Sequence, residues 1–255
     1  MKSLTKSEII KKIKQKKELS GLADQVISDL LEDYLTKYKI SLNNISKSDF
    51  KIIIKEIRSK LRLLTGRFQK SQKNREILLQ KNNIKELLKT HTSTGERLEF
   101  YPKLKKIIKS LKINSILDIA CGLNPIAIAN PSITYTACDI KEDELKLIQV
   151  YFNKNNIKGK TFVCDLKKNP NLPNADLCLL FKVLDILEVK NHALANSIID
   201  KLNCKYLIIS FPTKKLSGKP MNEPKRFWLE KLLKSKNLEF TIFFSDNEIF
   251  YLVEK

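Results

Sequence analysis

Residues 115–125 read SILDIACGLNP, an apolar run that ends in a polar turn containing one glycine. The run over 115–119 has the length and the apolar character of a buried strand. Open α/β sheets bind ligands at the carboxyl ends of their strands, so the turn that follows is a candidate site. Gly122 is the residue that best lets the backbone approach a ligand there.

Further apolar runs follow along the second half of the chain, at residues 133–139, 160–165, 175–181, 205–211, 238–244 and 248–253. A helix is expected over about 141–154, and the last two runs are close enough to form a hairpin around the turn 245–247. Five strands separated by helices and followed by a hairpin predict an α/β fold. Its sheet is expected to be mostly parallel, with one antiparallel strand.

The first half of the chain has helical periodicity and no strong strand signal before residue 115. Apolar residues recur at helical spacing over 5–38, with a break at Ser20 and Gly21 that separates two helices. A third helix is expected after the polar segment 46–49. Shorter helices are expected near 72–80 and 83–89.

Residues 93–110 are expected to form one helix that leads into the α/β half. Ser93 and Glu96 have the spacing of a capping box at its start. The sequence therefore predicts two domains, an all-helical N-terminal domain over 1–90 and an α/β domain over 91–255.

Charge is distributed unevenly between these halves. The chain carries 48 Lys and Arg against 28 Asp and Glu. Residues 1–114 hold 28 basic and 12 acidic side chains, whereas residues 115–255 hold 20 and 16. A basic front half indicates a polyanionic partner, and nucleic acid is the natural one. The side chains expected to track phosphates are Lys11, Lys12, Lys14, Lys16, Lys17, Arg58, Arg62, Arg67, Lys70, Lys73 and Arg75.

Several classes of protein are disfavoured by composition. No stretch approaches the ~18 consecutive apolar residues of a membrane span, and the N-terminus lacks the apolar block of a signal peptide. The five cysteines form no C-x-x-C pair, which argues against a zinc site and a disulfide framework. We therefore expect a cytoplasmic protein with no metal.

Three carboxylates fall at the ends of the first three strands, Asp118, Asp139 and Asp165. Asp139 is placed to accept hydrogen bonds from both hydroxyls of a ribose, and Asp165 from the exocyclic amine of an adenine. Each could instead be a helix cap. A dinucleotide site would show G-x-G-x-x-G, and this turn has one glycine. No P-loop is present.

Four segments carry a resemblance to a known family: 91–98 (HTSTGERL), 117–125 (LDIACGLNP), 179–184 (LLFKVL) and 209–219 (ISFPTKKLSGK). With these segments the chain resembles the aminoglycoside-resistance 16S ribosomal RNA methyltransferases of the Arm/Rmt type, which methylate N7 of a guanine in the decoding site. The resemblance covers roughly residues 85–255. It implies a Rossmann-like class I methyltransferase fold and S-adenosylmethionine as cofactor.

The resemblance also implies roles for single residues. Arg97 would lie near the cofactor carboxylate, and Lys182 and Ser210 would position the guanine at the mouth of the site. Family members usually have Gly where this chain has Ala120. The implied cofactor-binding residues are Arg97, Asp118, Ala120, Gly122, Asp139, Ile140, Asp165, Leu166 and Phe181.

The chemistry of guanine N7 agrees with the lack of an evident general base. N7 carries a lone pair and no proton, so orientation in line with the methyl donor supplies most of the rate. A pyrimidine-C5 enzyme would need a cysteine nucleophile after strand four or five, and Cys178 and Cys204 precede those positions. An amino-group enzyme would usually show Asp/Asn-Pro-Pro-aromatic where this chain has 181–184.

The expected partner is 16S ribosomal RNA in the 30S subunit, and the expected state is a monomer that confers aminoglycoside resistance. Three alternatives stay open. The chain could methylate another ribosomal RNA position such as an adenine N1, it could be a non-catalytic RNA-binding relative, or it could methylate a small molecule.

Overall fold

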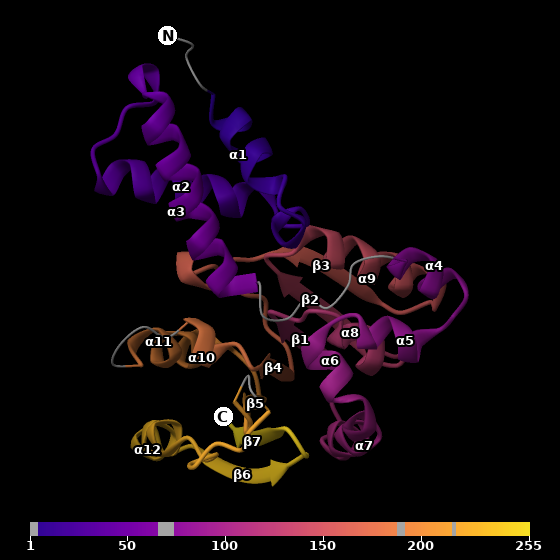
Figure 1. Cartoon of the computed structure of the whole chain (residues 1–255). Coiled ribbons are helices and arrows are strands. Elements are labelled where there is room, and N and C mark those ends of the chain that lie inside the picture. The colour runs from indigo at the N-terminus through magenta and orange to yellow at the C-terminus, as the bar shows by residue number, and fades with distance from the viewer. Residues whose placement is uncertain (1–4, 66–73, 188–191, 216–217) are drawn as a thin grey trace.

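A computed structural model describes residues 5–65, 74–187, 192–215 and 218–255. Its centre is one seven-stranded sheet with the strand order β3-β2-β1-β4-β5-β7-β6 (Figure 1). The strands are β1 (Ser115–Ile119), β2 (Thr134–Asp139), β3 (Gly159–Val163), β4 (Leu177–Phe181), β5 (Tyr206–Pro212), β6 (Glu239–Phe244) and β7 (Glu248–Glu254). The predicted runs thus became strands within a few residues of their expected bounds.

The sheet has the predicted polarity. Strands β1 to β5 pair in parallel, and β7 pairs antiparallel with both β5 and β6. The order reverses between β1 and β4, because the chain returns to the middle of the sheet after β3. This crossover leaves a crevice at the carboxyl ends of β1 and β4, where open α/β sheets hold their ligands.

The helices of the described chain are α1 (Lys6–Lys14), α2 (Asp24–Lys37), α3 (Lys47–Thr65), α4 (Arg75–Gln80), α5 (Ile84–Lys89), α6 (Thr92–Glu96), α7 (Tyr101–Ser110), α8 (Asn124–Ile128), α9 (Glu142–Lys154), α10 (Leu184–Leu187), α11 (Ala193–Lys201) and α12 (Phe227–Ser235). Short 3-10 helices are η1 (Lys17–Leu19), η2 (Leu42–Asn44), η3 (Leu98–Phe100) and η4 (Leu166–Lys168). No helix of the described residues has the length and apolar character to cross a membrane.

Helices cover both faces of the sheet (Figure 1). The central strand β4 shows why, since its side chains alternate between two apolar cores. Leu177 and Leu179 point into the core formed with α5, α7, α8 and α9. Cys178 and Leu180 point into the core formed with α10, α11 and α12. A strand that is buried on both faces is apolar throughout, which made it visible in the sequence.

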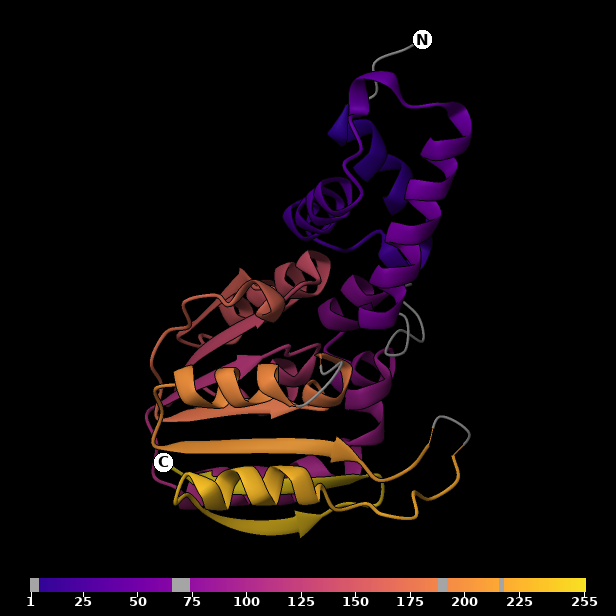
Figure 2. The same cartoon turned by 90° about the vertical axis from the view of Figure 1, so that its left-hand side faces the viewer.

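The first three helices form a separate apolar cluster that stands beyond the β3 edge of the sheet (Figure 2). It includes Ile9, Ile27 and Ile57, one from each helix. Helix α3 begins at Lys47, earlier than expected, and Ser46 accepts a hydrogen bond from the amide of Asp49 at 3.1 Å. The helices α4 and α5 instead contribute to the core of the sheet, although they precede residue 90.

The segment 93–110 is not one helix. It divides into α6, η3 and α7, and the expected capping box is wrong. Helix α6 begins at Thr92 without a side-chain cap, and Ser93 and Glu96 bond to Arg97 and Lys182 instead. Ser93, Arg97 and Lys182 line the pocket beside this bend.

The helical cluster joins the sheet at the turn after β2. The amide of Ala23 donates to the carbonyl of Ile140 at 3.0 Å, and Leu22 forms an antiparallel bridge with Lys141. The Lys141 ammonium donates to the carbonyl of Glu18 at 3.3 Å. The first two helices are therefore attached to the turn that directly follows Asp139.

Candidate active site

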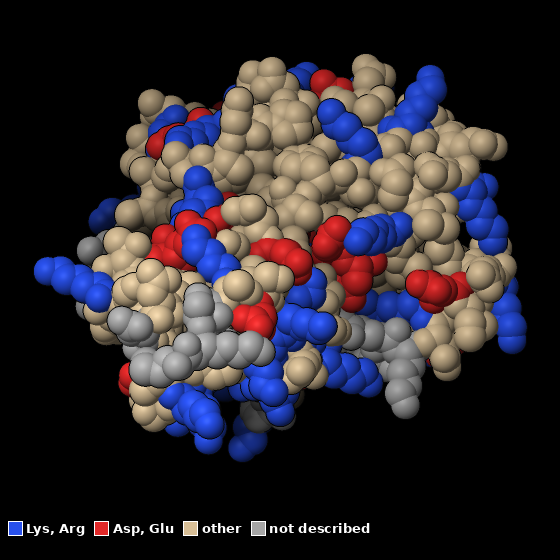
Figure 3. All heavy atoms as spheres, turned by 90° about the horizontal axis from the view of Figure 1, so that it is seen from above, with Lys and Arg blue, Asp and Glu red and all other residues tan. Residues whose placement is uncertain are grey.

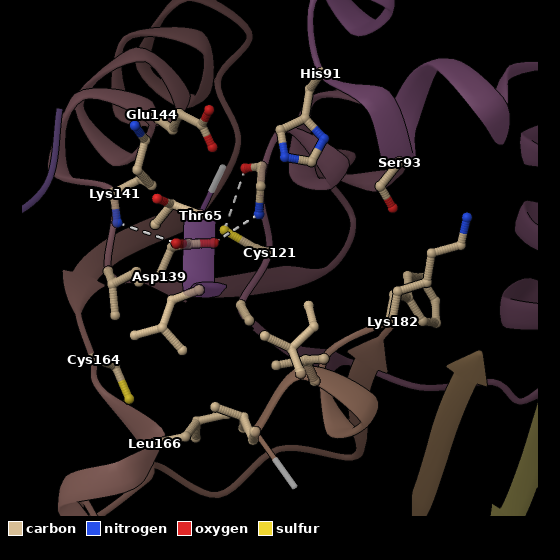
Figure 4. Close-up of a pocket in the computed structure, with 18 of the residues that line it drawn as sticks. Thr65, His91, Ser93, Cys121, Asp139, Lys141, Glu144, Cys164, Leu166 and Lys182 are labelled. Carbon is tan, nitrogen blue, oxygen red and sulfur yellow. Dashed lines mark hydrogen bonds between the residues drawn. The ribbon is translucent and has the colours of Figure 1, made fainter. Parts of the chain in front are cut away.

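A pocket opens at the carboxyl ends of the central strands, with walls from both halves of the chain (Figure 4). Figure 4 shows Asp139, Cys164 and Leu166 on one side and Ser93 and Lys182 on the other. The lining residues are Leu64, Thr65, His91, Ser93, Thr94, Arg97, Ala120, Cys121, Gly122, Asp139, Ile140, Lys141, Glu144, Cys164, Asp165, Leu166, Phe181, Lys182, Val183, Ile186 and Leu187.

Asp139, at the end of β2, is held in a fixed orientation by backbone donors. Its Oδ2 accepts from the amide of Gly122 at 2.9 Å, and its Oδ1 accepts from the amide of Lys141 at 3.1 Å. An ionised carboxylate has about four lone-pair sites, so acceptor capacity remains on both oxygens. Burial, with the nearby charge of Glu144, raises the pKa of Asp139 to about 6.

The turn after β1 adopts an unusual backbone conformation. Ala120 has φ of 53° and Gly122 has φ of 50°, both in the left-handed region. A Cβ added at Gly122 would lie 2.9 Å from Cε1 and Nε2 of His91, so glycine is required by conformation and by space. Ala120 carries its methyl group in a conformation that costs an L-residue roughly 1–2 kcal/mol.

The lower wall of the pocket is largely apolar. Ile140 and Leu166 line it together with Cys164, and Leu166 is buried. Asp165 is half-buried at the same wall and accepts a hydrogen bond from the amide of Lys167 at 2.9 Å, which makes it the cap of η4. Its second oxygen accepts no hydrogen bond from the described residues. An apolar wall with a carboxylate beside it suits a purine ring.

Arg97 lines the opposite end and is 1% exposed. It forms an ion pair with Glu248, through Nη2 at 2.7 Å and Nε at 3.1 Å. The remaining contacts of its guanidinium are with Ser93 Oγ, Asn124 Oδ1 and Tyr101 OH, at 3.2, 3.3 and 3.5 Å. The five N–H donors of the guanidinium thus make five hydrogen bonds to acceptors within the described chain. Burial lowers the pKa of Arg97, but the charge of Glu248, the interaction with Tyr101 and the hydrogen bonds to both residues together outweigh it, so the pKa is raised.

Lys182 follows β4 with φ of 56° and lies at the pocket wall. Its ammonium group is 2.8 Å from Glu96 Oε2 and 3.5 Å from Glu248 Oε2. Its amide donates to the carbonyl of Ser210 on β5 at 3.0 Å. The polar end of the pocket therefore holds two cations and two carboxylates in contact, and Phe181 lies under Arg97, with 4.6 Å from the guanidinium carbon to the ring centroid.

Two expected site residues do not line the pocket. Ser210 is fully buried, and its hydroxyl donates to Glu248 Oε1. Asp118 is buried below the turn, where its Oδ2 accepts from Tyr135 OH at 2.7 Å and Asn124 Nδ2 at 2.8 Å. Burial raises the pKa of Asp118 to about 7. Both residues therefore hold other side chains in place from outside the pocket lining.

The predicted phosphate-contacting residues divide into four groups, of which the buried Arg75 is one. Lys11, Lys12, Lys16 and Lys17 are exposed on α1 and η1. Lys14 pairs with Asp24 at 2.5 Å, Arg62 pairs with Glu18 at 2.8 Å, and Arg58 donates to the carbonyl of Lys12. Arg67, Lys70 and Lys73 lie outside the described residues.

Arg75 does not lie on a phosphate-contacting surface, so that expectation is wrong. It is buried and forms a 2.8 Å ion pair with Glu144, and its Nε donates to Thr90 Oγ1 at 2.8 Å. Seen from the helical end, Lys and Arg lie on all sides of the molecule and are densest at the lower edge of the view, and Asp and Glu lie mainly across the middle (Figure 3). The helical half thus exposes fewer of the basic side chains that were expected to contact phosphates than the sequence suggested.

Sequence reasoning missed Glu248, Glu144 and His91. Glu248 is fully buried at the start of β7, and its only local signal is a charge beside an apolar run. Glu144 looks like an ordinary acidic residue of a first helical turn. The ring of His91 lines the pocket, and burial lowers its pKa to about 4, so it is neutral at physiological pH.

The chain is similar in sequence to several ribosomal RNA methyltransferases. A 16S rRNA (guanine(1405)-N(7))-methyltransferase of Serratia marcescens is 32% identical over 143 residues, 55% of this chain and 57% of the relative. An enzyme of the same name from Micromonospora echinospora is 26% identical over 182 residues, which are 68% of this chain and 66% of the relative. The chain spans about half to two thirds of the length of these curated relatives.

Solved structures show the same fold. The 16S rRNA methyltransferase RmtF, in complex with S-adenosyl-L-homocysteine, has a TM-score of 0.81 at 24% identity, over 98% of both chains. The 16S rRNA methylase RmtB has a TM-score of 0.78 at 24% identity, over 98% of both chains. These likenesses confirm the predicted Rossmann-like methyltransferase fold along with its helical N-terminal part. A family model described as ribosomal RNA methyltransferase (FmrO) matches residues 78–241, and the chain belongs to this family.

Proposed function

We propose that this protein transfers a methyl group from S-adenosylmethionine to N7 of a guanine in the decoding site of 16S ribosomal RNA, within the 30S subunit. The observation that carries the proposal is the pocket at the strand crossover. It combines a fixed carboxylate, an apolar wall and a charged end, in a chain of the ribosomal RNA methyltransferase family. The guanine N7 and 16S assignments follow the names of the sequence relatives.

The pocket residues fit the parts of this cofactor. Asp139 has acceptor capacity left for the ribose hydroxyls, and Asp165 has an oxygen for the adenine amine. Ile140 and Leu166 offer the apolar walls that an adenine ring needs. Because the N–H donors of Arg97 already have acceptors, we expect it to hold Ser93 and Glu248 around the amino-acid end. We therefore do not expect Arg97 by itself to bind the carboxylate of the cofactor.

The bound cofactor supplies an electrophilic methyl group. The task of this chain is then to hold the guanine in line and to exclude water, since N7 has no proton to remove. The target base must leave its stack to reach a pocket this deep. Lys182 stands at the pocket wall with Glu96 and is the residue we expect to orient the base. Ser210 acts behind it, through its carbonyl and through Glu248.

Docking on the 30S subunit is assigned to α1–α3, as a unit that attaches to the sheet domain at residues 140–143. The exposed lysines of α1 and η1 would contact phosphates without reading sequence. We place α4 and α5 with the methyltransferase domain, because their apolar side chains enter the core of the sheet. We expect a cytoplasmic monomer as the working form.

The test is transfer of labelled methyl groups to purified 30S subunits, naked 16S RNA and 70S ribosomes. We expect label on 30S subunits, and loss of label with Asp139→Asn. Asp246→Asn, in the β6–β7 turn, removes the same charge away from the pocket and is the matched control. No label on any substrate, with cofactor bound, would contradict the proposal and favour a non-catalytic RNA-binding relative.

Methylation of this guanine should also change antibiotic susceptibility. We expect expression in a sensitive bacterium to raise resistance to 4,6-disubstituted aminoglycosides such as gentamicin and kanamycin. The Asp139→Asn protein, expressed at the same level, should leave susceptibility unchanged. Normal susceptibility in cells whose 30S subunits are methylated would contradict the proposal that the methylation confers resistance.

A further inference from the structure

The segment that follows β5, residues 213–226, holds the whole net charge of residues 115–255. It contains five basic residues and one acidic residue, and the other residues of 115–255 contain fifteen of each. The basic residues are Lys214, Lys215, Lys219, Lys225 and Arg226. A charge excess confined to one connection of an otherwise neutral stretch of 141 residues marks a surface for a polyanion.

This segment forms an arm, and backbone hydrogen bonds connect its outgoing and returning sides. Lys214 forms an antiparallel bridge with Pro220, and the amide of Lys215 donates to the carbonyl of Lys219 at 2.8 Å. At the base, the amide of Met221 donates to the carbonyl of Thr213 at 2.8 Å. In Figure 2 the described parts of the arm, residues 213–215 and 218–226, lie beyond the arrowhead of β5 and lead back to α12.

Arg226 anchors the returning side. Its Nη2 donates to Asp185 of α10 at 2.8 Å and to the carbonyl of Pro212 at 3.2 Å, and its guanidinium carbon lies 5.0 Å from the centroid of Phe211. Its amide donates to Tyr251 OH at 2.8 Å. Because the base is fixed on three elements, the arm carries its lysines at a defined place and loses less entropy on binding.

The lysines of the arm are free to bind. Lys214, Lys215, Lys219 and Lys225 are all exposed, and none has an acidic partner among the described residues. This contrasts with the helical half, where Lys14 and Arg62 are held by carboxylates. Unpaired lysines release counterions from a nucleic acid without first breaking an ion pair.

The arm stands across the pocket from the helical cluster. It begins three residues after Ser210, whose carbonyl accepts from the amide of Lys182 at the pocket wall. Leu64 and Thr65, at the end of α3, line the other side of the same pocket. The RNA strand continues on both sides of a nucleotide that enters the pocket between the arm and α3. The helical cluster can contact the strand on one side of that nucleotide, which leaves the other side to the arm.

We infer that this lysine arm, residues 213–226, is a second RNA-contacting surface that binds phosphates of the substrate RNA on the side of the target nucleotide opposite to α1–α3. The inference rests on the proposed function and names the partner surface of the same site. The arm positions RNA through charge, so it contributes to docking and carries no base specificity. A ribosomal protein as the contact is the competing outcome.

The test is the salt dependence of 30S binding for a variant with Lys214, Lys215 and Lys219 each changed to Gln. The matched control changes Lys109, Lys112 and Lys158 to Gln, because these exposed lysines lie before the amino ends of β1 and β3. We expect the arm variant to lower the slope of log affinity against log salt by about 2 to 3 and affinity by about ten- to a hundredfold. The control should match the wild type.

Affinity for S-adenosylhomocysteine, measured by calorimetry, shows whether each variant is folded, and we expect all to stay within about twofold of the wild type. If the triple Gln variant fails this check, single Lys215→Gln takes its place, with about a third of the slope change. A variant with Arg at the three positions keeps the charge and should bind like the wild type.

The outcomes separate the arm from the proposed function. Wild-type methylation of 30S subunits with an unchanged slope in the arm variant would overturn the arm alone. Weaker binding of the arm variant with an unchanged slope would also overturn it, in favour of a ribosomal protein contact. A wild-type protein that neither binds nor methylates 30S subunits would overturn both.

Discussion

Arg97 and Glu248 lie 151 residues apart in the sequence and form a doubly hydrogen-bonded ion pair, with both side chains 1% exposed. Glu248 also accepts from Ser210 and lies 3.5 Å from the Lys182 ammonium. One carboxylate thus ties the segment before the sheet, the turn after β4 and the antiparallel strand into one end of the pocket. Its buried charge is compensated only while all these contacts are present.

Removing that carboxylate should destabilise the fold. We expect Glu248→Ala to lower the free energy of unfolding by about 3–5 kcal/mol, because the Arg97 charge stays buried without its partner. Glu254→Ala, on the exposed end of the same strand, is the control and should change it by less than about 0.5 kcal/mol. Urea unfolding measures both, and equal midpoints would refute the structural role given to Glu248.

Cofactor affinity should depend on the ionisation of Asp139. Burial raises its pKa to about 6, and only the ionised form accepts from both ribose hydroxyls. Affinity for S-adenosylhomocysteine should therefore be constant above about pH 7 and fall about tenfold per unit below pH 6. In Asp139→Asn this dependence should vanish and affinity should stay low. Calorimetry across this pH range measures the dependence. Asp118→Asn, which lies outside the pocket, is the control and should keep the same midpoint of affinity against pH.

The turn at Gly122 should not tolerate a side chain. We expect Gly122→Ala to weaken cofactor binding at least about tenfold, since φ of 50° is strained for alanine and the methyl group meets His91. Gly218→Ala has φ of 80° with open space around its Cβ, so it tests strain alone and should leave cofactor affinity unchanged. Equal affinity in both variants would show that the contact with His91 is unimportant.

Ala120 should accept glycine without loss. The left-handed conformation costs alanine roughly 1–2 kcal/mol, and glycine removes this cost. Glycine also raises the conformational entropy of the unfolded chain, which lowers the stability by about 0.4–1 kcal/mol and offsets part of the gain. We expect Ala120→Gly to range from neutral to about 1 kcal/mol more stable, with cofactor affinity equal or higher. Ala127→Gly, in the buried helix α8, should lose about 1 kcal/mol. A less stable Ala120→Gly protein would contradict the strain assigned to this position.

The sequence predicted the features that depend on local pattern. Apolar runs of strand length predicted the whole sheet, and carboxylates at strand ends predicted Asp139 and Asp165 as pocket residues. It failed where distant contacts decide. The helical spacing of 93–110 concealed a bend beside Arg97 and Lys182, and nothing near Glu248 shows that it faces Arg97. Ser210 was placed at the mouth by its motif, but its hydroxyl turns inward to Glu248.

The most direct test of the central claim is the position of the methyl group on the RNA. Purified 30S subunits are incubated with the protein and S-adenosylmethionine, and the 16S RNA is then cleaved by chemistry specific for N7-methylguanine. The account predicts one new cleavage, at a guanine of the decoding site, and none with Asp139→Asn. Methyl transfer without that cleavage would contradict it, because the modified atom would then be one other than guanine N7.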